Sequence, residues 1–201
     1  ILMKENTISN AIDFLDKSLN NLIDGNVSMD KLAITRALRS GYKNPNQIAH
    51  KVLADRIAER EPGNKPKPGD RIKYLFINTD TKKKLMGERI ETPEFITNND
   101  IEIDYAHYIT NQLMKPLQQL FGLAVEKIWE HQRKPNAIKK YRKDIENLEL
   151  EHGDDYELYM KKKEKYCSAK VKTLLFDKVL NKIANKRNGI QMITNFYTFA
   201  K

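Results

Sequence analysis

Hydrophobic side chains near the start of this chain recur with the period of an α-helix. Aliphatic residues return every three or four positions, with polar residues between them, at Ile8, Ile12, Leu15, Leu19, Leu22 and Ile23. This spacing predicts an amphipathic helix over residues 8–23. Gly25 and Asn26 follow it, and residues of these types commonly end a helix because they tolerate a left-handed backbone.

The next part of the chain combines short extended segments with one further helix. Residues 32–35 predict a short extended segment. A second helix is expected over about residues 46–61, where the apolar stripe consists of Ile48, Val52, Leu53 and Ile57. Pro62 and Gly63 are expected to end this helix, because proline cannot continue the hydrogen-bond pattern.

Alternating positions predict a strand after this helix. Ile72, Tyr74 and Phe76 alternate with other side chains, which predicts a strand over residues 71–78. Three consecutive lysines at residues 82–84 are expected in the turn that follows, and a second strand is expected over residues 84–90. Together these segments predict a small β element between helices.

Helical spacing returns from residue 103 onward. One apolar stripe consists of Tyr105, Tyr108, Ile109, Gln112, Leu113, Leu117, Leu120 and Phe121. Pro116 lies within it and should kink or restart the helix. From residue 126 two or three lysine-rich helices are expected, with breaks at residues 134–135 and 151–154 and an end near residues 188–189. The pattern therefore predicts a mainly α fold with a small β element, of the α+β class.

Length and composition narrow the class of protein. A chain of 201 residues can bury one hydrophobic core or form two small subdomains. No apolar run approaches the roughly 20 residues that cross a bilayer, the start lacks a signal-peptide pattern, and no membrane partner is expected. The single cysteine, Cys167, excludes a disulfide within the chain and a cysteine-rich zinc site. The four histidines do not have metal-ligand spacing.

Positive charge is concentrated in two blocks. Residues 31–89 carry a net charge of +9 and residues 126–187 carry +6, whereas residues 1–30 and 90–125 are net negative. Basic blocks are typical of proteins that bind phosphate groups. A solvated lysine-rich surface is the alternative, and it stays open for residues 126–187, where acidic residues are interleaved.

Residues 40–74 combine the most informative features. Glycine and proline turns flank the helix expected over residues 46–61, positive charge is dense, and no group there suits catalysis. We interpret this stretch as a rigid platform that presents lysine and arginine to an anionic partner.

Several blocks in order resemble the thumb of family B DNA polymerases. The blocks are residues 32–39, 47–56, 62–66, 69–74, 94–96, 103–109 and 112–117. The resemblance covers roughly residues 1–123 and is greatest to the replicative branch shared by eukaryotes and large DNA viruses, which indicates a large-virus enzyme. It implies a helical domain that grips the primer–template duplex by its backbone and minor groove. The chain would then divide into a thumb domain (1–125), a lysine-rich helical extension (126–187) and a tail (188–201).

Nine residues are the candidates for duplex binding. They are cationic side chains and polar residues near a helix start, where free N–H groups also favour phosphate, namely Arg36, Arg39, Lys43, Asn46, Gln47, His50, Lys51, Lys65 and Arg71. For Arg56 and Asp70 structural hydrogen bonds are the favoured interpretation, and His50 has the same alternative.

The catalytic parts implied by the resemblance are expected outside this chain. Polymerase chemistry needs two carboxylates that hold two metal ions, and in this family one lies in a Tyr-Gly-Asp-Thr-Asp turn. Around Asp80 the chain instead has Lys82 in the position of the second aspartate, so no metal is assigned. Because the chain begins with Ile1, we expect a fragment whose palm, with its magnesium ions, precedes it, and which is not catalytic alone. The implied location is intracellular, in the nucleus or a cytoplasmic virus factory.

The end of the chain resembles the clamp-binding peptide of replication proteins. Ile193, Phe196 and Tyr197 match the aliphatic and paired aromatic positions of such peptides, but Ile190 occupies the place of the usual glutamine. A sliding clamp or viral processivity factor is therefore a candidate partner, and docking of these side chains on the chain's own domain is the alternative. Two other functions stay open: a non-enzymatic replisome interaction module acting through residues 126–201, and a free-standing helical DNA-binding protein.

Overall fold

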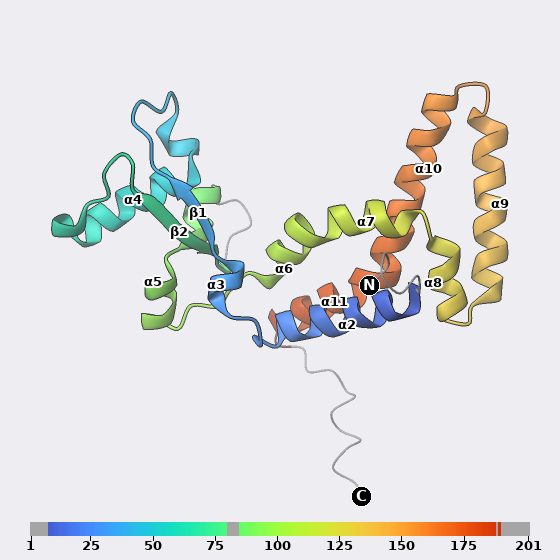
Figure 1. Cartoon of the computed structure of the whole chain (residues 1–201), viewed down its shortest axis with the longest axis horizontal. Helices are drawn as coiled ribbons and strands as arrows, with labels where there is room; N and C mark the ends of the chain where they lie inside the picture. Colours follow the sequence, from blue (N-terminus) through green and yellow to red (C-terminus); the bar gives the residue numbers. More distant parts are fainter. Residues whose placement is uncertain (1–7, 80–84, 188, 190–201) are drawn as a thin grey trace, which may run out of the picture. The chain divides into compact units, whose positions relative to one another are not determined.

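The computed structural model describes residues 8–79, 85–187 and 189 (Figure 1). The chain divides into two compact units, one formed by Gly25–Tyr108 and the other by Ile1–Asp24 together with Ile109–Lys201. Helices dominate, and the described strands form one three-stranded sheet, so the predicted fold class is confirmed.

The unit formed by residues 25–108 contains the sheet. Its strands are β1 (Ile34–Ala37), β2 (Arg71–Phe76) and β3 (Ile90–Glu91). They pair antiparallel in the order β1-β2-β3. The helices and turns are α3 (Met29–Leu32), η1 (Pro45–Gln47), α4 (Ala49–Arg60), η2 (Pro62–Asn64), η3 (Met86–Arg89), α5 (Pro93–Asn98) and α6 (Tyr105–Tyr108).

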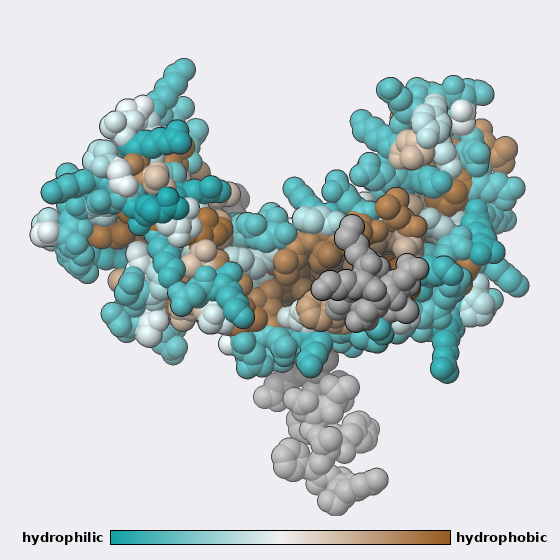
Figure 2. Space-filling view, viewed as in Figure 1, coloured by the Kyte–Doolittle hydropathy of each residue, from teal (hydrophilic) through white to brown (hydrophobic). Residues whose placement is uncertain are grey.

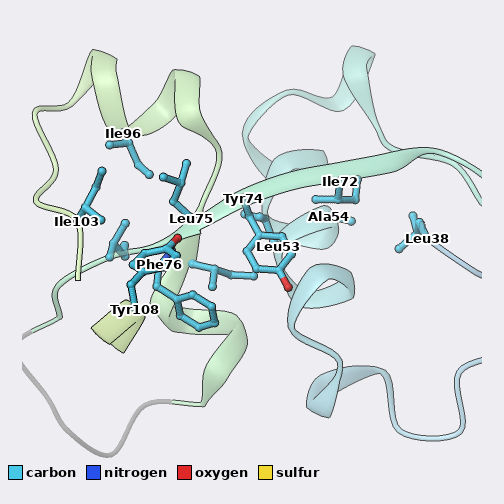
Figure 3. Packing of buried hydrophobic residues seen from close by; sticks show 12 residues of the cluster. Leu38, Leu53, Ala54, Ile72, Tyr74, Leu75, Phe76, Ile96, Ile103 and Tyr108 are labelled. Carbon is cyan, nitrogen blue, oxygen red and sulfur yellow. The ribbon is translucent and has the colours of Figure 1, made fainter. Parts of the chain in front are cut away.

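Alternation along β2 divides the core of this unit between the two faces of the sheet. Tyr74 lies beside Leu53 of α4 and Ile72 lies beside Ala54 of the same helix, whereas Leu75 lies near Ile96 of α5 (Figure 3). Leu53 and Leu75 are completely buried. Helix α4 is thereby fixed to the sheet, and its first turn is held beside β1 and the loop after it.

Buried ion pairs add to this packing. Glu91 is 3% exposed, and both of its oxygens accept hydrogen bonds from Arg60, at 2.8 and 3.2 Å. Nε of Arg56 lies 3.0 Å from Oε1 of Glu91, although its N–H does not point at the carboxylate. The guanidinium of Arg60 also stacks on Phe95 at 3.6 Å. These contacts join α4 to β3 and α5.

The second unit is helical throughout its described residues. Its elements are α2 (Ile8–Ile23), the π-helical turn η4 (Ile109–Leu113), α7 (Met114–Gly122), α8 (Val125–His131), α9 (Pro135–His152), α10 (Tyr156–Val171), the π-helical turn η5 (Lys172–Phe176) and α11 (Asp177–Arg187). Helix α10 packs on α7 and α9, and α2 packs on α8 and α11. Lys182 donates to Oδ1 of Asn20 at 2.8 Å, which links the two ends of the chain's described part.

Several predicted elements are confirmed and others are corrected. The helix over residues 8–23 and the breaks at 134–135 and 151–154 are present. The strand expected over 84–90 is wrong for its described residues, because Met86–Arg89 forms a 3-10 turn and the strand begins at Ile90. The predicted segment 32–35 begins in α3 and becomes extended only at Ile34, and Leu120 of the predicted stripe is 48% exposed. Residues 82–84 lie outside the described part.

The predicted domain boundaries at residues 125 and 187 do not coincide with the division into two compact units. The compact unit that contains residues 126–187 also includes α2 and α7, so the lysine-rich helices pack on part of the segment that resembles a polymerase thumb. The compact units are defined by packing, whereas the predicted boundaries separate segments of different function. The boundaries at residues 125 and 187 therefore stay predictions.

Candidate nucleic-acid interface

Four of the predicted residues meet where β1 ends and α4 begins. Arg36 is exposed on β1, Arg39 is exposed on the loop after it, and His50 lies in the first turn of α4. His50 Nε2 lies 3.0 Å from the hydroxyl of Tyr42, and the same hydroxyl accepts the backbone N–H of Arg39 at 2.8 Å. The loop and the start of the helix are thus joined through Tyr42. Lys51, the next residue of α4, is half-buried and paired with Asp55 one turn later.

The charge of His50 is set by its surroundings. Burial lowers the pKa of its imidazole most, and the positive charges of Arg36 and Arg39 lower it further. A hydrogen bond to the backbone of Ala37 acts in the opposite direction. Since the ordinary pKa is already below 7, the ring is mainly neutral at pH 7.

A hollow of about 390 Å³ brings further cations together. Arg39, Lys51 and Lys65 line it, together with Gly41 and Asp55. Gly41 has φ +74° and no atom close to its missing side chain, which suits a turn that leaves space for a ligand. The lining carries three positive charges and one negative charge, so its field favours an anion.

Further polar residues lie between the cationic hollow and the start of α4. Lys43 is exposed on the loop, and Asn46 and Gln47 are exposed within η1. Ile48 is the N-cap of α4, so the first N–H groups of the helix, which carry a partial positive charge, lie next to η1. On the visible face in Figure 2 the surface of residues 25–108 is largely hydrophilic.

Arg71 is separated from this group by the sheet. In the β1–β2 ladder Arg36 lies opposite Ile72, whereas Arg71 lies opposite Ala37. Directly opposed residues of an antiparallel pair point to the same face, so Arg36 and Arg71 point to different faces. Arg71 instead lines a second hollow of about 420 Å³, with Lys65, Arg60 and Phe95. Lys65 and Pro66 line both hollows, and Lys65 is the charged residue that they share.

The structural roles expected for Arg56 and Asp70 are confirmed. Arg56 donates to the carbonyl oxygens of Gly87 and Ile90, at 3.1 and 2.6 Å. The carboxylate of Asp70 accepts the backbone N–H of Lys67 at 2.7 Å. Both residues therefore hold the frame of the site.

The sequence pattern did not single out Tyr42. This residue bonds across a loop to a side chain eight positions later, and such a contact has no helical or strand period that could reveal it. The turn residues at 40–45 give only a general signal that the chain folds back there.

The helical unit carries a hollow of a different character. It has a volume of about 840 Å³, lies along α7 and α10, and is lined by apolar, uncharged polar and charged side chains that include Leu123, Tyr156 and Met160. Leu123 is 90% exposed and Tyr156 is 71% exposed. Ile193, Phe196 and Tyr197, the predicted clamp-binding positions, lie outside the described residues.

Two further observations bear on possible ligands. Among residues 8–79, 85–187 and 189 there is no group of three histidine, cysteine, aspartate or glutamate side chains that could hold a metal ion. In that same part of the chain no helix has both the length and the apolar character that a membrane crossing requires.

Comparison with known proteins gives a consistent result. The family model described as DNA polymerase family B matches residues 2–123. A DNA polymerase of Pyramimonas orientalis virus is 42% identical over 200 residues, which is 98% of this chain and 16% of that protein. A DNA polymerase of Acanthamoeba polyphaga mimivirus is 42% identical over 62% of this chain and 8% of its own length. The DNA polymerase delta catalytic subunit of Caenorhabditis elegans is 36% identical over 69% of this chain and 13% of its own length. The chain thus spans a small part of each of these relatives.

Proposed function

Because this chain belongs to the family B DNA polymerases, we propose that its first 125 residues form the thumb, which holds the primer–template duplex behind the polymerase active site. The observation that carries this proposal is the group of exposed cations around the hollow between the β1–α4 loop and residue 65. Lysine and arginine neutralise backbone phosphates without reading sequence, which suits an enzyme that must move along any template.

The nucleotide-transfer chemistry of the whole enzyme is expected in a different domain. We propose that nucleotide transfer, and the two magnesium ions that it requires, belong to a palm domain that these residues do not include. The present chain would contribute affinity for the duplex and would not catalyse the reaction alone. Its place of action would be the site of DNA replication, in the nucleus or in a cytoplasmic virus factory.

The salt dependence of duplex binding tests the proposal. Fluorescence anisotropy of a labelled primer–template duplex should show an affinity that falls steeply between 50 and 200 mM salt. If five phosphates are neutralised, the slope of log affinity against log salt is about −4.5. Duplexes of unrelated sequence should bind equally. Absence of binding at 50 mM salt, or an affinity independent of salt, would contradict duplex holding.

A second function is favoured by the hollow along α7 and α10. Its exposed apolar side chains and its mixed charges suit protein docking better than phosphate binding. We propose that the chain also docks a sliding clamp or viral processivity factor, either through residues 126–201 and their tail at Ile193, Phe196 and Tyr197 or through this hollow, which residues of both α7 and α10 line.

Calorimetry of the whole chain with the cognate clamp can separate these two docking sites. If the tail docks, the double variant F196A/Y197A should lose the heat of binding and L123K should keep it. If the hollow docks, the result should be reversed; Leu123 is so exposed that its replacement should not disturb the fold. No heat with the unaltered chain at high micromolar concentration would rule out clamp docking by either route.

A further inference from the structure

Tyr42 is an uncharged residue at the centre of the cationic site. Its hydroxyl lies between the backbone N–H of Arg39, at 2.8 Å, and Nε2 of His50, at 3.0 Å. Its ring meets the His50 ring edge-on at 5.9 Å and packs against the hydrophobic core of the unit. The side chain thus packs on the core and also lines the hollow, together with Arg39, Lys51 and Lys65.

We propose that Tyr42 is a positioning residue, whose hydroxyl fixes the Arg39 loop and the His50 imidazole so that Arg36 and Arg39 each face a backbone phosphate of the duplex. This inference rests on the proposed function of the unit and goes beyond it, because it assigns the order of the site to a residue that makes no phosphate contact.

The loop needs such an anchor. Leu38 is held by two backbone bonds, since its N–H donates to Asp70 and its carbonyl accepts from Gly69, each at 2.8 Å. After Leu38 the chain leaves the ladder and turns through Gly41 in a left-handed conformation. The Tyr42 hydroxyl holds the first N–H beyond that ladder. Ordering a residue costs on the order of 1–2 kcal/mol, and a loop that is ordered beforehand avoids this cost when it binds.

The directions of the hydrogen bonds follow from the neighbours of His50. Ala37 raises the pKa of the imidazole, as an accepting carbonyl would, so we assign the proton of the neutral ring to the nitrogen that faces Ala37. Nε2 then has a free lone pair and accepts the Tyr42 O–H. The Tyr42 oxygen in turn accepts the Arg39 N–H. The hydroxyl thus donates one hydrogen bond and accepts one in this arrangement.

This arrangement also controls the charge of the site. The charged groups that act on His50 are Arg36 from β1 and Arg39 from the loop, and the adjacent Lys51 of α4 is paired with Asp55. A hydrogen bond donated to Nε2 stabilises the neutral ring, because a protonated Nε2 could not accept it. Arg36 and Arg39 therefore act beside a neutral imidazole and not beside a third positive charge.

The variant Y42F tests the inference, because it removes the hydroxyl and keeps the ring. Duplex affinity should fall about fivefold, which is the effect of one lost hydrogen bond, while the salt slope should stay unchanged because no phosphate contact is removed. In NMR titration of the free protein the pKa of His50 should rise, because the neutral ring loses its donor. The amide proton of Arg39 should exchange faster with solvent. A residue that only fills space would change neither of the last two measurements.

The matched control is Y105F in the same unit. Tyr105 is also half-buried, and its hydroxyl lies near Gly25, away from the hollow. Y105F should keep duplex affinity, the His50 pKa and Arg39 exchange. If Y42F binds like the unaltered chain, or leaves both the His50 pKa and Arg39 exchange unchanged, the positioning role is wrong while duplex holding stands. If the unaltered chain does not bind duplex, the proposed function fails, and this inference fails with it.

Discussion

Replacing Arg36, Arg39 and Lys51 together by glutamate should reduce duplex affinity by about 500-fold at 0.1 M salt. Each phosphate contact makes the slope of log affinity against log salt steeper by about 0.9. Three contacts that contribute little at 1 M salt therefore raise log affinity by about 2.7 at 0.1 M salt, and their loss lowers it by the same amount. The slope itself should become shallower by about 2.7. Arg36 and Arg39 are exposed, and Lys51 lines the hollow beside Arg39, so the three substitutions act on one surface. Anisotropy titrations at several salt concentrations measure both quantities.

The charge-matched control lies in the other unit. Lys139, Lys140 and Lys143 are exposed on α9, and their replacement by glutamate changes the net charge of the chain equally. This variant should bind within about threefold of the unaltered chain if the duplex contacts only the β1–α4 surface. An equal loss in both variants would show that the effect comes from net charge, and the localised site would be wrong. Circular dichroism should confirm that both variants keep their helices.

Periodic patterns explain which elements were predictable. Residues 8–23 and 135–152 form helices whose ends carry glycine, proline or both, and their ends were predicted closely. The strand prediction was wrong for residues 85–89 because Met86–Arg89 forms a short 3-10 turn. This turn is closed by a hydrogen bond from the Leu85 N–H to the Glu88 carboxylate. A four-residue turn is too short to show a period, so its apolar residues suggest a strand equally well.

The candidate site could also be predicted only in part from the sequence. Charge and turn residues indicated a cationic surface, and the exposed positions of Arg36, Arg39 and Lys65 agree with that expectation. The sequence pattern could not show that Arg36 and Arg71 point to different faces, because that follows from the register Ala37↔Arg71 between strands far apart in sequence. Tyr42 escaped notice for the same reason, since its role depends on a contact and not on its residue type.

The buried carboxylate of Glu91 stabilises the unit formed by residues 25–108, although no sequence pattern distinguishes this residue. It is 3% exposed and is surrounded by two guanidinium groups, with Arg60 bonded to both oxygens and Arg56 at 3.0 Å. Burial lowers the pKa of Arg56, the Glu91 charge is the largest influence in the opposite direction, and the Arg60 charge lowers it again. Without Glu91 the two cations would repel each other in a poorly solvated place. The carboxylate thus holds α4 to β3, and α4 carries His50 and Lys51 into the site.

The variant E91Q should therefore destabilise the unit formed by residues 25–108 by about 3 kcal/mol, the effect expected when one partner of a buried ion pair is removed. Glutamine keeps the shape but brings an N–H₂ donor against guanidinium donors. Urea unfolding measures the change, and E59Q, on an exposed position of α4, is the control, expected within about 0.5 kcal/mol. Well below its unfolding midpoint E91Q should keep the salt slope of duplex binding, because Glu91 does not line the cationic hollow. A loss below 1 kcal/mol would mean that water replaces the carboxylate adequately, and Glu91 would not be the residue that fixes α4.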